Sequence, residues 1–373
     1  MFSGTAINYI SLSVPLHWIV PTTQQWNFGI QHQLGGNWVA ELGYVGTKGT
    51  HLRSTFDPDQ PALASASNPI TLTCGNSTAP CLTAATGTKY TITQNTIANS
   101  SARAPYLGIA PAAYEAFYPN SDSHYNALQA SLSHHFAKGL YLQSAYTWSK
   151  SIDDVSTASV AFLTRVNDQN NARASRGLSD FDHRHRLVTS FNYALPFLNN
   201  RQDLAGHVLG GWEAGGVIIL QSGEPITILD GNGGSTYQLA SPVSTANFAP
   251  GYGCHNALNS GSLATRLANW VNPSAYRPAP VVGSDGSTGF GDSPRNCIIG
   301  PGQSNIDFTL AKTFKLGENQ NVLFRTEFFN LFNHPSFANP SSTANVAAGS
   351  AIGEINQTVG TPRLIQFSLK YLF

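Results

Sequence analysis

The last eleven residues, "RLIQFSLKYLF" at 363–373, decide the fold class. A repeat of two residues is typical of a β-strand with one apolar and one polar face. Chain ends usually fray in polar residues, so an apolar terminal strand is expected to belong to the main sheet. The apolar parity holds Ile365, Phe367, Leu369, Tyr371 and Phe373, and the polar parity holds Gln366, Ser368 and Lys370.

Nine segments of the chain alternate in this way, and most run 8 to 12 residues. That is the length of a tilted strand that crosses a bilayer, and it is longer than the usual strand of a globular protein. Aromatic and β-branched residues dominate the apolar parity, as strands prefer. The nine segments are 26–34, 38–45, 125–136, 140–149, 186–195, 212–221, 306–314, 322–332 and 365–373.

The connections alternate between short and long. Short turns are expected at "GGN", "AKG", "PFLNNRQDLAGHVLGG" and "KLGENQ", whereas long loops occupy 47–122, 151–183, 222–303 and 333–362. Outer-membrane barrels have short periplasmic turns and long extracellular loops. The pattern therefore predicts an all-β antiparallel meander of about nine transmembrane strands with long extracellular loops.

Charge placement agrees with a lipid-facing sheet. Only 11% of the residues are charged, against about 25% in ordinary soluble proteins. A charge on the lipid face costs roughly 2–4 kcal/mol near the midplane. Of the charged residues in the nine segments only Lys312 shares the apolar parity, and it lies close enough to a strand end to snorkel. The others are Glu41, Arg186, Glu213, Asp307, Arg325, Glu327 and Lys370.

A soluble sheet over an ordinary core also places charges outside, so this alternative stays open. Aromatic residues near the strand ends fit either membrane-interface girdles or the filling of a β core. They are Trp26, Trp38, Tyr44, Tyr146, Trp148, Tyr193, Trp212, Tyr371 and Phe373.

Several segments resemble the C-terminal barrel of Oar-like TonB-dependent outer-membrane transporters. They include "YNALQASLSHHFAKGLYLQSAYTWSKSIDD", "FDHRHRLVTSFNYALPF", "GWEAGGVIILQSGEPITI" and "NIDFTLAKTFKLGENQNVLFRTEFFNLFNHPSFANP". "VGTPRLIQFSLKYLF" and "GYVGTKGTHL" fit the same pattern, and the matches run in order from about residue 22 to the end. We therefore expect a lead-in segment at 1–21 without a signal peptide, and a barrel section at 22–373.

The resemblance implies localisation in the outer membrane and active uptake of a ligand, with outer-membrane lipid and the barrel-assembly machinery as partners. It implies a complete barrel of 22 strands with a plug, so this chain is expected to be incomplete without the plug and the remaining strands. The TonB complex is a partner only if an upstream plug exists. The resemblance also makes Ile365, Phe367, Leu369, Tyr371 and Phe373 the signal for barrel assembly.

No chemistry-bearing motif stands out, so we expect no enzyme, no cofactor and no metal site. The net charge is zero, which gives no reason to expect a nucleic-acid partner. "DFDHRHR" offers Asp180, Asp182, His183 and His185, with both histidines on one strand face, but a solvated loop entering a strand is favoured. Asp230 and Asn232 resemble the start of a calcium loop that lacks its final Glu. Asp153–Asp154 loosely suggests the acidic rim of an omptin-like protease, without the further residues such a site needs.

The four cysteines lie in two of the long loops. An extracellular position is oxidising, so disulfides Cys74–Cys81 and Cys254–Cys297 are expected, with free thiols as the alternative.

The function that we expect from the resemblance is that of a TonB-dependent transporter or receptor component for an unidentified ligand. The alternative is a non-transporting β-rich surface, structural or binding protein encoded by a gene fragment.

Overall fold

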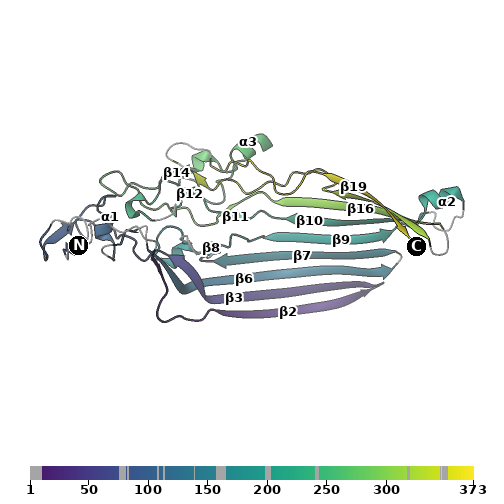
Figure 1. Ribbon diagram of the computed structural model, residues 1–373, viewed down its shortest axis with the longest axis horizontal. Coiled ribbons are helices and arrows are strands. Elements are labelled where there is room, and N and C mark those ends of the chain that lie inside the picture. Colours follow the sequence, from purple (N-terminus) through teal and green to yellow (C-terminus); the bar gives the residue numbers. More distant parts are fainter. Residues whose placement is uncertain are drawn as a thin grey trace.

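The computed structural model contains one long antiparallel sheet with an assembly of packed loops at one of its ends (Figure 1). The main strands of the sheet follow the order of the chain, so that each strand pairs with its neighbours in sequence. The structure describes residues 11–74, 81, 84–106, 109–111, 114–137, 139–156, 165–197, 203–239, 243–316, 320–344, 346 and 352–373.

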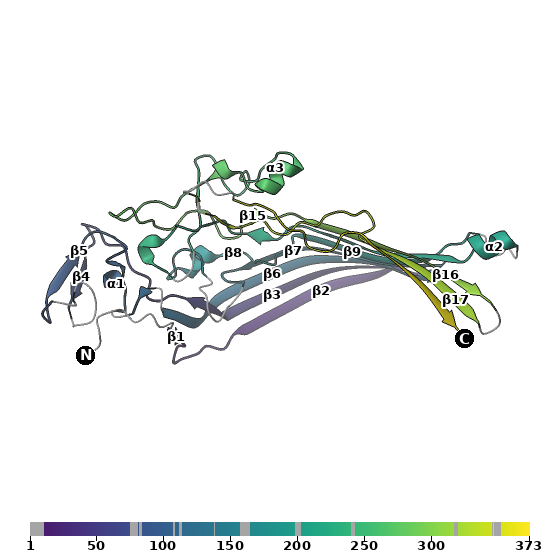
Figure 2. The same ribbon diagram turned by 45° about the horizontal axis from the view of Figure 1, so that its top comes forward.

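Nine strands form the main path of the sheet, which confirms the predicted meander. Figure 2 shows that the sheet is curved and that its first and last strands lie at opposite edges. Within the described part of the chain these two edges do not pair with each other, so the sheet is open. The strands are β2 (Thr22–Gly35), β3 (Trp38–Phe56), β6 (Tyr114–Ala137), β7 (Leu140–Asp153), β9 (His185–Ala194), β10 (Trp212–Gln221), β16 (Gln303–Lys315), β17 (Asn321–Phe329) and β19 (Leu364–Leu372).

The remaining elements are short and lie outside this main path. Two of them extend the sheet: β1 (Ser11–Ser13) pairs in parallel with β6, and β8 (Gly177–Leu178) pairs with β7. The others are the strands β4 (Ile70–Thr73), β5 (Lys89–Ile92), β11 (Pro225–Ile226), β12 (Leu229–Asp230), β13 (Asn247–Phe248), β14 (Tyr276–Arg277), β15 (Ile298–Ile299) and β18 (Thr343–Ala344), the helices α1 (Ser100–Arg103), α2 (Leu204–Leu209) and α3 (Leu263–Ala268), and the 3₁₀ turns Ala172–Ser175, Ser235–Tyr237 and Pro273–Ala275.

Short turns and long loops lie at opposite ends of the sheet, as predicted (Figure 1). Asp153 ends β7 at the same end of the sheet where His185 begins β9 and Gln303 begins β16, whereas Lys315 ends β16 beside Asn321. We call these the loop end and the turn end. At the turn end, Gly35, Gly36 and Asn37 all have positive φ angles (88°, 56° and 66°), which is why "GGN" can reverse the chain so tightly.

The strands β3 and β6 are much longer than predicted, with 19 and 24 residues. They stay paired beyond the apolar alternation, out to Phe56 and Ala116, with register shifts around Gly49–Arg53. The predicted loop 47–122 is therefore wrong at both of its ends. Backbone pairing does not need one apolar face, so the sequence pattern stops before the hydrogen-bond ladder does.

The final residues of the predicted strand 322–332 form a turn instead. Asn330 adopts a φ of 51° and its backbone N–H donates to Asp307, which ends the ladder at Phe329. The left-handed conformation is one that Asn tolerates better than most residues. This turn redirects the chain over the polar face of the sheet.

The apolar face of the sheet is not covered by the described part of the chain. Phe28, Phe367 and Leu369 are 68%, 68% and 73% exposed. Two hydroxyls on this face, those of Ser144 and Thr189, hydrogen-bond to each other across neighbouring strands at 2.8 Å. An uncovered apolar face of this size requires an apolar surrounding.

The position of Lys312 near a strand end predicted that its side chain would snorkel along the apolar face to the interface. The structure shows a different contact. Lys312 Nζ donates to the backbone carbonyl of Val208 at 3.1 Å and to that of Gly210, at the C-terminal end of α2, and it lies 5.7 Å from the centre of the Trp212 ring. The side chain is buried because the α2 segment folds back onto the turn end. No local pattern indicates this contact, since α2 lies within a predicted turn.

The densest apolar core lies in the loop assembly. Its buried residues come from the two long loops 222–302 and 330–363, and they include Trp270, whose Nε1 donates to the Ile299 carbonyl at 2.9 Å. The core consists of Ile226, Ile228, Ala246, Ala257, Trp270, Val271, Ala275, Tyr276, Ile298, Ile352 and Ile355. The described parts of these loops are therefore packed around a common apolar core.

We predict that Leu42→Arg destabilises the lipid-bound chain by about 2–4 kcal/mol, because Leu42 is 50% exposed on the apolar face midway between Trp38 and Gly46. The control is Gln129→Arg, which adds the same charge on the polar face of the neighbouring strand. Urea unfolding of the chain bound to phospholipid vesicles, followed by Trp fluorescence, measures both. Equal effects of the two substitutions would contradict the assignment of the faces.

Candidate functional site

The polar face of the sheet carries a groove at its loop end. Its floor is formed by residues that the register places side by side, with Arg186 opposite Gln221 and Gln221 opposite Gln303. The chain segments that follow β17 and precede β19 form one wall. The groove has a volume of about 690 Å³ and is lined by Arg186, Ile219, Gln221, Gln303, Asn305, Asp307, Phe329, Asn330, His334, Ser336, Val359, Gly360, Thr361, Leu364 and Gln366.

Hydrogen bonds hold much of this lining in place. Gln221 Nε2 donates to Gln303 Oε1 at 2.9 Å, and Asn305 Nδ2 donates to Asp307 Oδ1 at 3.0 Å. The wall is tied down by Asn330, whose Nδ2 donates to the carbonyls of His334 and Thr361. A groove supported in this way presents its polar groups in fixed positions.

A second hollow of about 470 Å³ continues along the polar face toward the turn end. It is more acidic than the first, since its lining includes Glu213, Asp307 and Glu327 but only one cation, Arg325. Arg325 pairs with Glu327 at 2.7 Å, an exposed pair worth little to stability. Phe329 and Asp307 line both hollows, so the two form one continuous polar surface.

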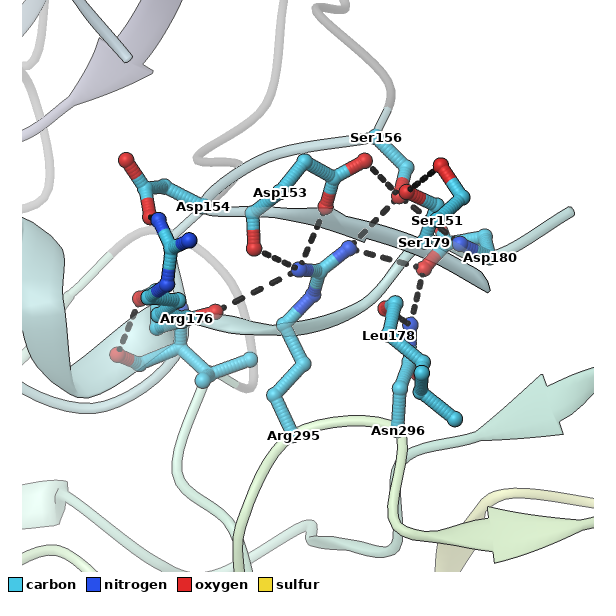
Figure 3. Close-up of polar contacts among 12 residues, drawn as sticks. Ser151, Asp153, Asp154, Ser156, Arg176, Leu178, Ser179, Asp180, Arg295 and Asn296 are labelled. Atoms are coloured by element: carbon cyan, nitrogen blue, oxygen red, sulfur yellow. Dashed lines mark hydrogen bonds and ion pairs between the residues drawn. The ribbon is translucent and has the colours of Figure 1, made fainter. Parts of the chain in front are cut away.

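Arg295 joins three parts of the loop end (Figure 3). Its Nη1 lies 2.7 Å from Asp153 Oδ1 at the end of β7, and its Nη2 donates to Ser156 Oγ at 2.6 Å and to Asp180 Oδ1 at 3.0 Å. Arg295 Nη1 also donates to the carbonyl of Ser175 at 3.3 Å. The guanidinium therefore fastens the loop 222–302 to the end of β7 and to the loop that follows it.

The neighbours of Arg295 complete this cluster. Asn296 Nδ2 donates to the Leu178 carbonyl at 2.7 Å and to Asp180 at 2.5 Å, while Ser151 and Ser179 share a hydroxyl hydrogen bond of 2.7 Å. Arg295 and Asp153 are only 6% and 3% exposed, so the charges are shielded from water. Removing one partner of a buried ion pair leaves the other uncompensated, which is costly.

We predict that Arg295→Ala destabilises the loop assembly by about 3–5 kcal/mol, because Asp153 would remain buried without its cation. Arg277→Ala removes an exposed arginine of the same loop and should change stability by less than about 0.5 kcal/mol. Urea titration with hydrogen–deuterium exchange of residues 175–180 measures both variants. A small effect of Arg295→Ala would show that the cluster does not hold the loops.

Three acidic side chains are buried where β3 leaves the sheet: Asp57, Asp59 and Glu115, at 1%, 0% and 3% exposure. Backbone N–H groups of Asp59 and Tyr106 donate to Asp57 and Asp59, each at 2.7 Å. Among the described residues, Asp59 Oδ2 and Glu115 Oε2 have no hydrogen-bond partner. Burial, and then the nearby charges of Asp59 and Glu115, raise the pKa of Asp57 to about 8. Burial raises the pKa of Asp59 to about 6.

These shifts predict that the segment around Asp57 loosens as the pH rises. A raised pKa means that the folded form binds the proton more tightly, so this stabilisation is complete below the ordinary pKa of 3.8 and is lost as the pH passes about 6 for Asp59 and about 8 for Asp57. Hydrogen–deuterium exchange of residues 57–61 at about pH 5 and about pH 9, corrected for intrinsic rates, measures it. Asp57→Asn should reduce the difference, whereas protection that grows with pH would contradict the prediction.

The residues of "DFDHRHR" separate in the structure. His183 lines a hollow on the polar face and its Nδ1 lies 2.8 Å from the Ser222 carbonyl, whereas His185 contacts the hydroxyl of Tyr146 on the apolar face (2.8 Å). The expectation that both histidines share one strand face is wrong, because β9 begins only at His185. Asp180 and Asp182 accept from Arg295 and the Ser151 N–H, respectively.

The other acidic motifs have structural partners. Asp153 pairs with Arg295, and Asp154 accepts from the Asp122 N–H at 3.1 Å. Asp230 is fully buried and accepts from the N–H groups of Asn232 and Ala279, so it shapes a turn. Within the described residues, no group of three or more His, Cys, Asp or Glu side chains is placed to hold a metal ion.

Both expected cysteine pairs are bonded in the structure. Cys74 pairs with Cys81 and Cys254 with Cys297, with Cα–Cα distances of 5.1 and 5.4 Å. The second bond closes a loop next to Arg295 and Asn296, where loop closure stabilises by about 4 kcal/mol in the chain-entropy model.

The residues of the expected assembly signal lie together at the end of the sheet. The apolar face of β19 carries Ile365, Phe367, Leu369 and Tyr371, and Phe373 follows directly after the strand.

Sequence reasoning missed Arg295, the buried acids and the groove. The position of Arg295 two residues before Cys297 was a usable signal, since a disulfide holds its neighbours in place. Nothing in the local pattern marked Asp57 or Glu115 as buried, because their burial depends on strands that extend past the apolar alternation.

The described part of the chain contains no helix with the length and apolar character needed to cross a membrane. A search of curated proteins finds no match. Among solved structures, the outer membrane transporter YddB from Escherichia coli aligns with 98% of this chain and 35% of its own length, at 9% identity and a TM-score of 0.45. BauA, the ferric preacinetobactin receptor from Acinetobacter baumannii, aligns with 94% of this chain and 29% of its own length, at 11% identity and a TM-score of 0.41.

The chain spans about a third of the length of these solved structures. A family model described as an outer membrane beta barrel domain matches residues 3–366, nearly the whole chain. The apolar surrounding that the uncovered face of the sheet requires is therefore the lipid of the outer membrane. This chain belongs to the outer membrane β-barrel domain family.

Proposed function

We propose that this chain is the barrel section of an Oar-like, TonB-dependent outer-membrane transporter or receptor that takes up a ligand from outside the cell. The observation that carries the proposal is the division of the sheet into an uncovered apolar face and a polar face with a groove at the loop end. In this proposal the loop end is extracellular, so the groove lies where an incoming ligand first meets the barrel wall.

The sheet has open edges at β2 and β19, and a barrel wall in the membrane requires partners for both. An unpaired backbone group costs several kcal/mol in hydrocarbon, so further strands must complete the wall in the membrane. We propose that these strands and a plug, through which the TonB complex supplies energy, come from sequence or chains beyond this one. The alternating residues of β19 and Phe373 would serve as the signal for the barrel-assembly machinery.

A non-transporting surface or structural protein is the second candidate. The packed loop assembly favours it, because a fixed, disulfide-bonded surface suits binding as well as transport. The two candidates differ in whether a compound crosses the membrane. Only transport depends on energy from the inner membrane.

We predict that cells of the native host with the gene remove at least one compound from the medium faster than cells with the gene deleted. The difference should disappear when TonB is inactivated, because uptake through such a barrel requires that energy. Mass spectrometry of spent medium from the three strains measures this for every detectable compound, so the ligand does not have to be chosen beforehand.

The control for this comparison is an immunoblot that shows equal outer-membrane levels of the protein with and without TonB. Identical media from all strains would favour the non-transporting alternative. A difference that persists without TonB would keep the transport function and refute its energy source.

A further inference from the structure

The charges around the loop-end groove balance. Its lining contains one permanent cation, Arg186, and one carboxylate, Asp307, together with His334. A site for an anionic ligand is expected to carry a surplus of cations, which attract and pair with it. The groove has no such surplus, so it suits an uncharged ligand.

Carboxamides dominate the remaining polar lining. Gln221, Gln303, Asn305, Asn330 and Gln366 each present both an acceptor oxygen and a donor NH₂ group. Asn330 uses its groups to hold the wall, but within the described residues the side chains of Arg186 and Gln366 make no hydrogen bond. Asp307 engages its Oδ1 with Asn305 and Asn330, and its Oδ2 makes no bond to the described part of the chain.

This set of free donors and acceptors fits hydroxyl groups. A hydroxyl donates one hydrogen bond and accepts others, so one hydroxyl of a ligand can donate to the carboxylate of Asp307 while others accept from Arg186 and Gln366. A ligand with many hydroxyls can satisfy several of these groups at once.

Phe329 breaks the polar pattern of this face. It follows Arg325 and Glu327 on the same parity, pairs with Leu364 on β19, and lies one residue beyond the Phe308–Phe328 pair that ends the ladder with β16. Together with Ile219 and Val359 it gives the groove an apolar surface beside its polar groups. Sugar rings present a face of C–H groups between their hydroxyls, and such a face packs well against aromatic and aliphatic side chains.

We propose that this groove binds an uncharged oligosaccharide, with Arg186, Asp307 and Gln366 contacting its hydroxyls and Phe329 contacting a ring face. The volume of about 690 Å³ lies within the range of ordinary small-ligand sites. An oligosaccharide would be the ligand class for the transport proposed above, and its direction of approach rests on that proposed function. The binding itself can be measured without transport.

The test is isothermal titration calorimetry on the full chain in a zwitterionic detergent, because glycoside detergents would compete. The probes are uncharged hexamers of α-glucan, β-glucan, xylan, mannan and chitin, with an anionic ferric tris-catecholate complex as the comparison. At least one saccharide should bind with a Kd below about 1 mM, which corresponds to about 4 kcal/mol.

The variants Gln366→Ala and Arg186→Ala should each weaken saccharide binding about tenfold, since each removes a donor without breaking an internal contact of the described chain. Ser368→Ala, which follows Gln366 on the same face and lies outside the groove, is the matched control and should bind as the parent does. Binding of the ferric complex alone, absence of any binding, or unchanged affinity in both groove variants would overturn the proposal. Uptake of a compound in the medium experiment together with no saccharide binding here would overturn the ligand class and leave the transport function intact.

Discussion

The antiparallel ladder of nine strands is the constraint on which the rest of the structure depends. Because side chains alternate with a period of two, a slip of one residue would move every apolar side chain to the polar face. The ladder keeps the same faces from β2 to β19, so that Arg186, Gln221 and Gln303 meet on one side while Tyr146, Ile218 and Ile306 lie on the other. The lipid-facing surface and the groove are two consequences of one register.

The loop assembly depends on the same ladder through its anchor points. Asp153 is the last residue of β7, and its position at the loop end is what allows Arg295 to reach it from a loop far along the chain. The apolar core of the loops and the Cys254–Cys297 bond hold their shape, while Arg295 holds their place above the sheet. This division explains how the described parts of these long loops keep one arrangement beside a regular strand array.

The sequence predicted the nine strands, their order, the two ends of the sheet and the paired cysteines. It failed at several contacts that reach beyond the alternation. The long extensions of β3 and β6 have no apolar face, Lys312 meets a helix in a predicted turn, and His183 precedes the strand that was expected to contain it. The groove was predicted only as a polar face, because its wall comes from the turn at Asn330.

The sequence by itself determined which residues face lipid and which face the polar side, since alternation is a local property that each strand carries alone. Tertiary structure decided how those residues combine. Arg295 has no local partner and becomes a clamp only when Asp153 and Asp180 are brought to it, more than a hundred positions away. Likewise the groove combines residues from three strands, namely Arg186, Asp307 and Gln366. One cation and one carboxylate balance there because the register places these strands side by side. Long-range contacts depend on the folded geometry of the whole chain, which a period-two pattern does not encode.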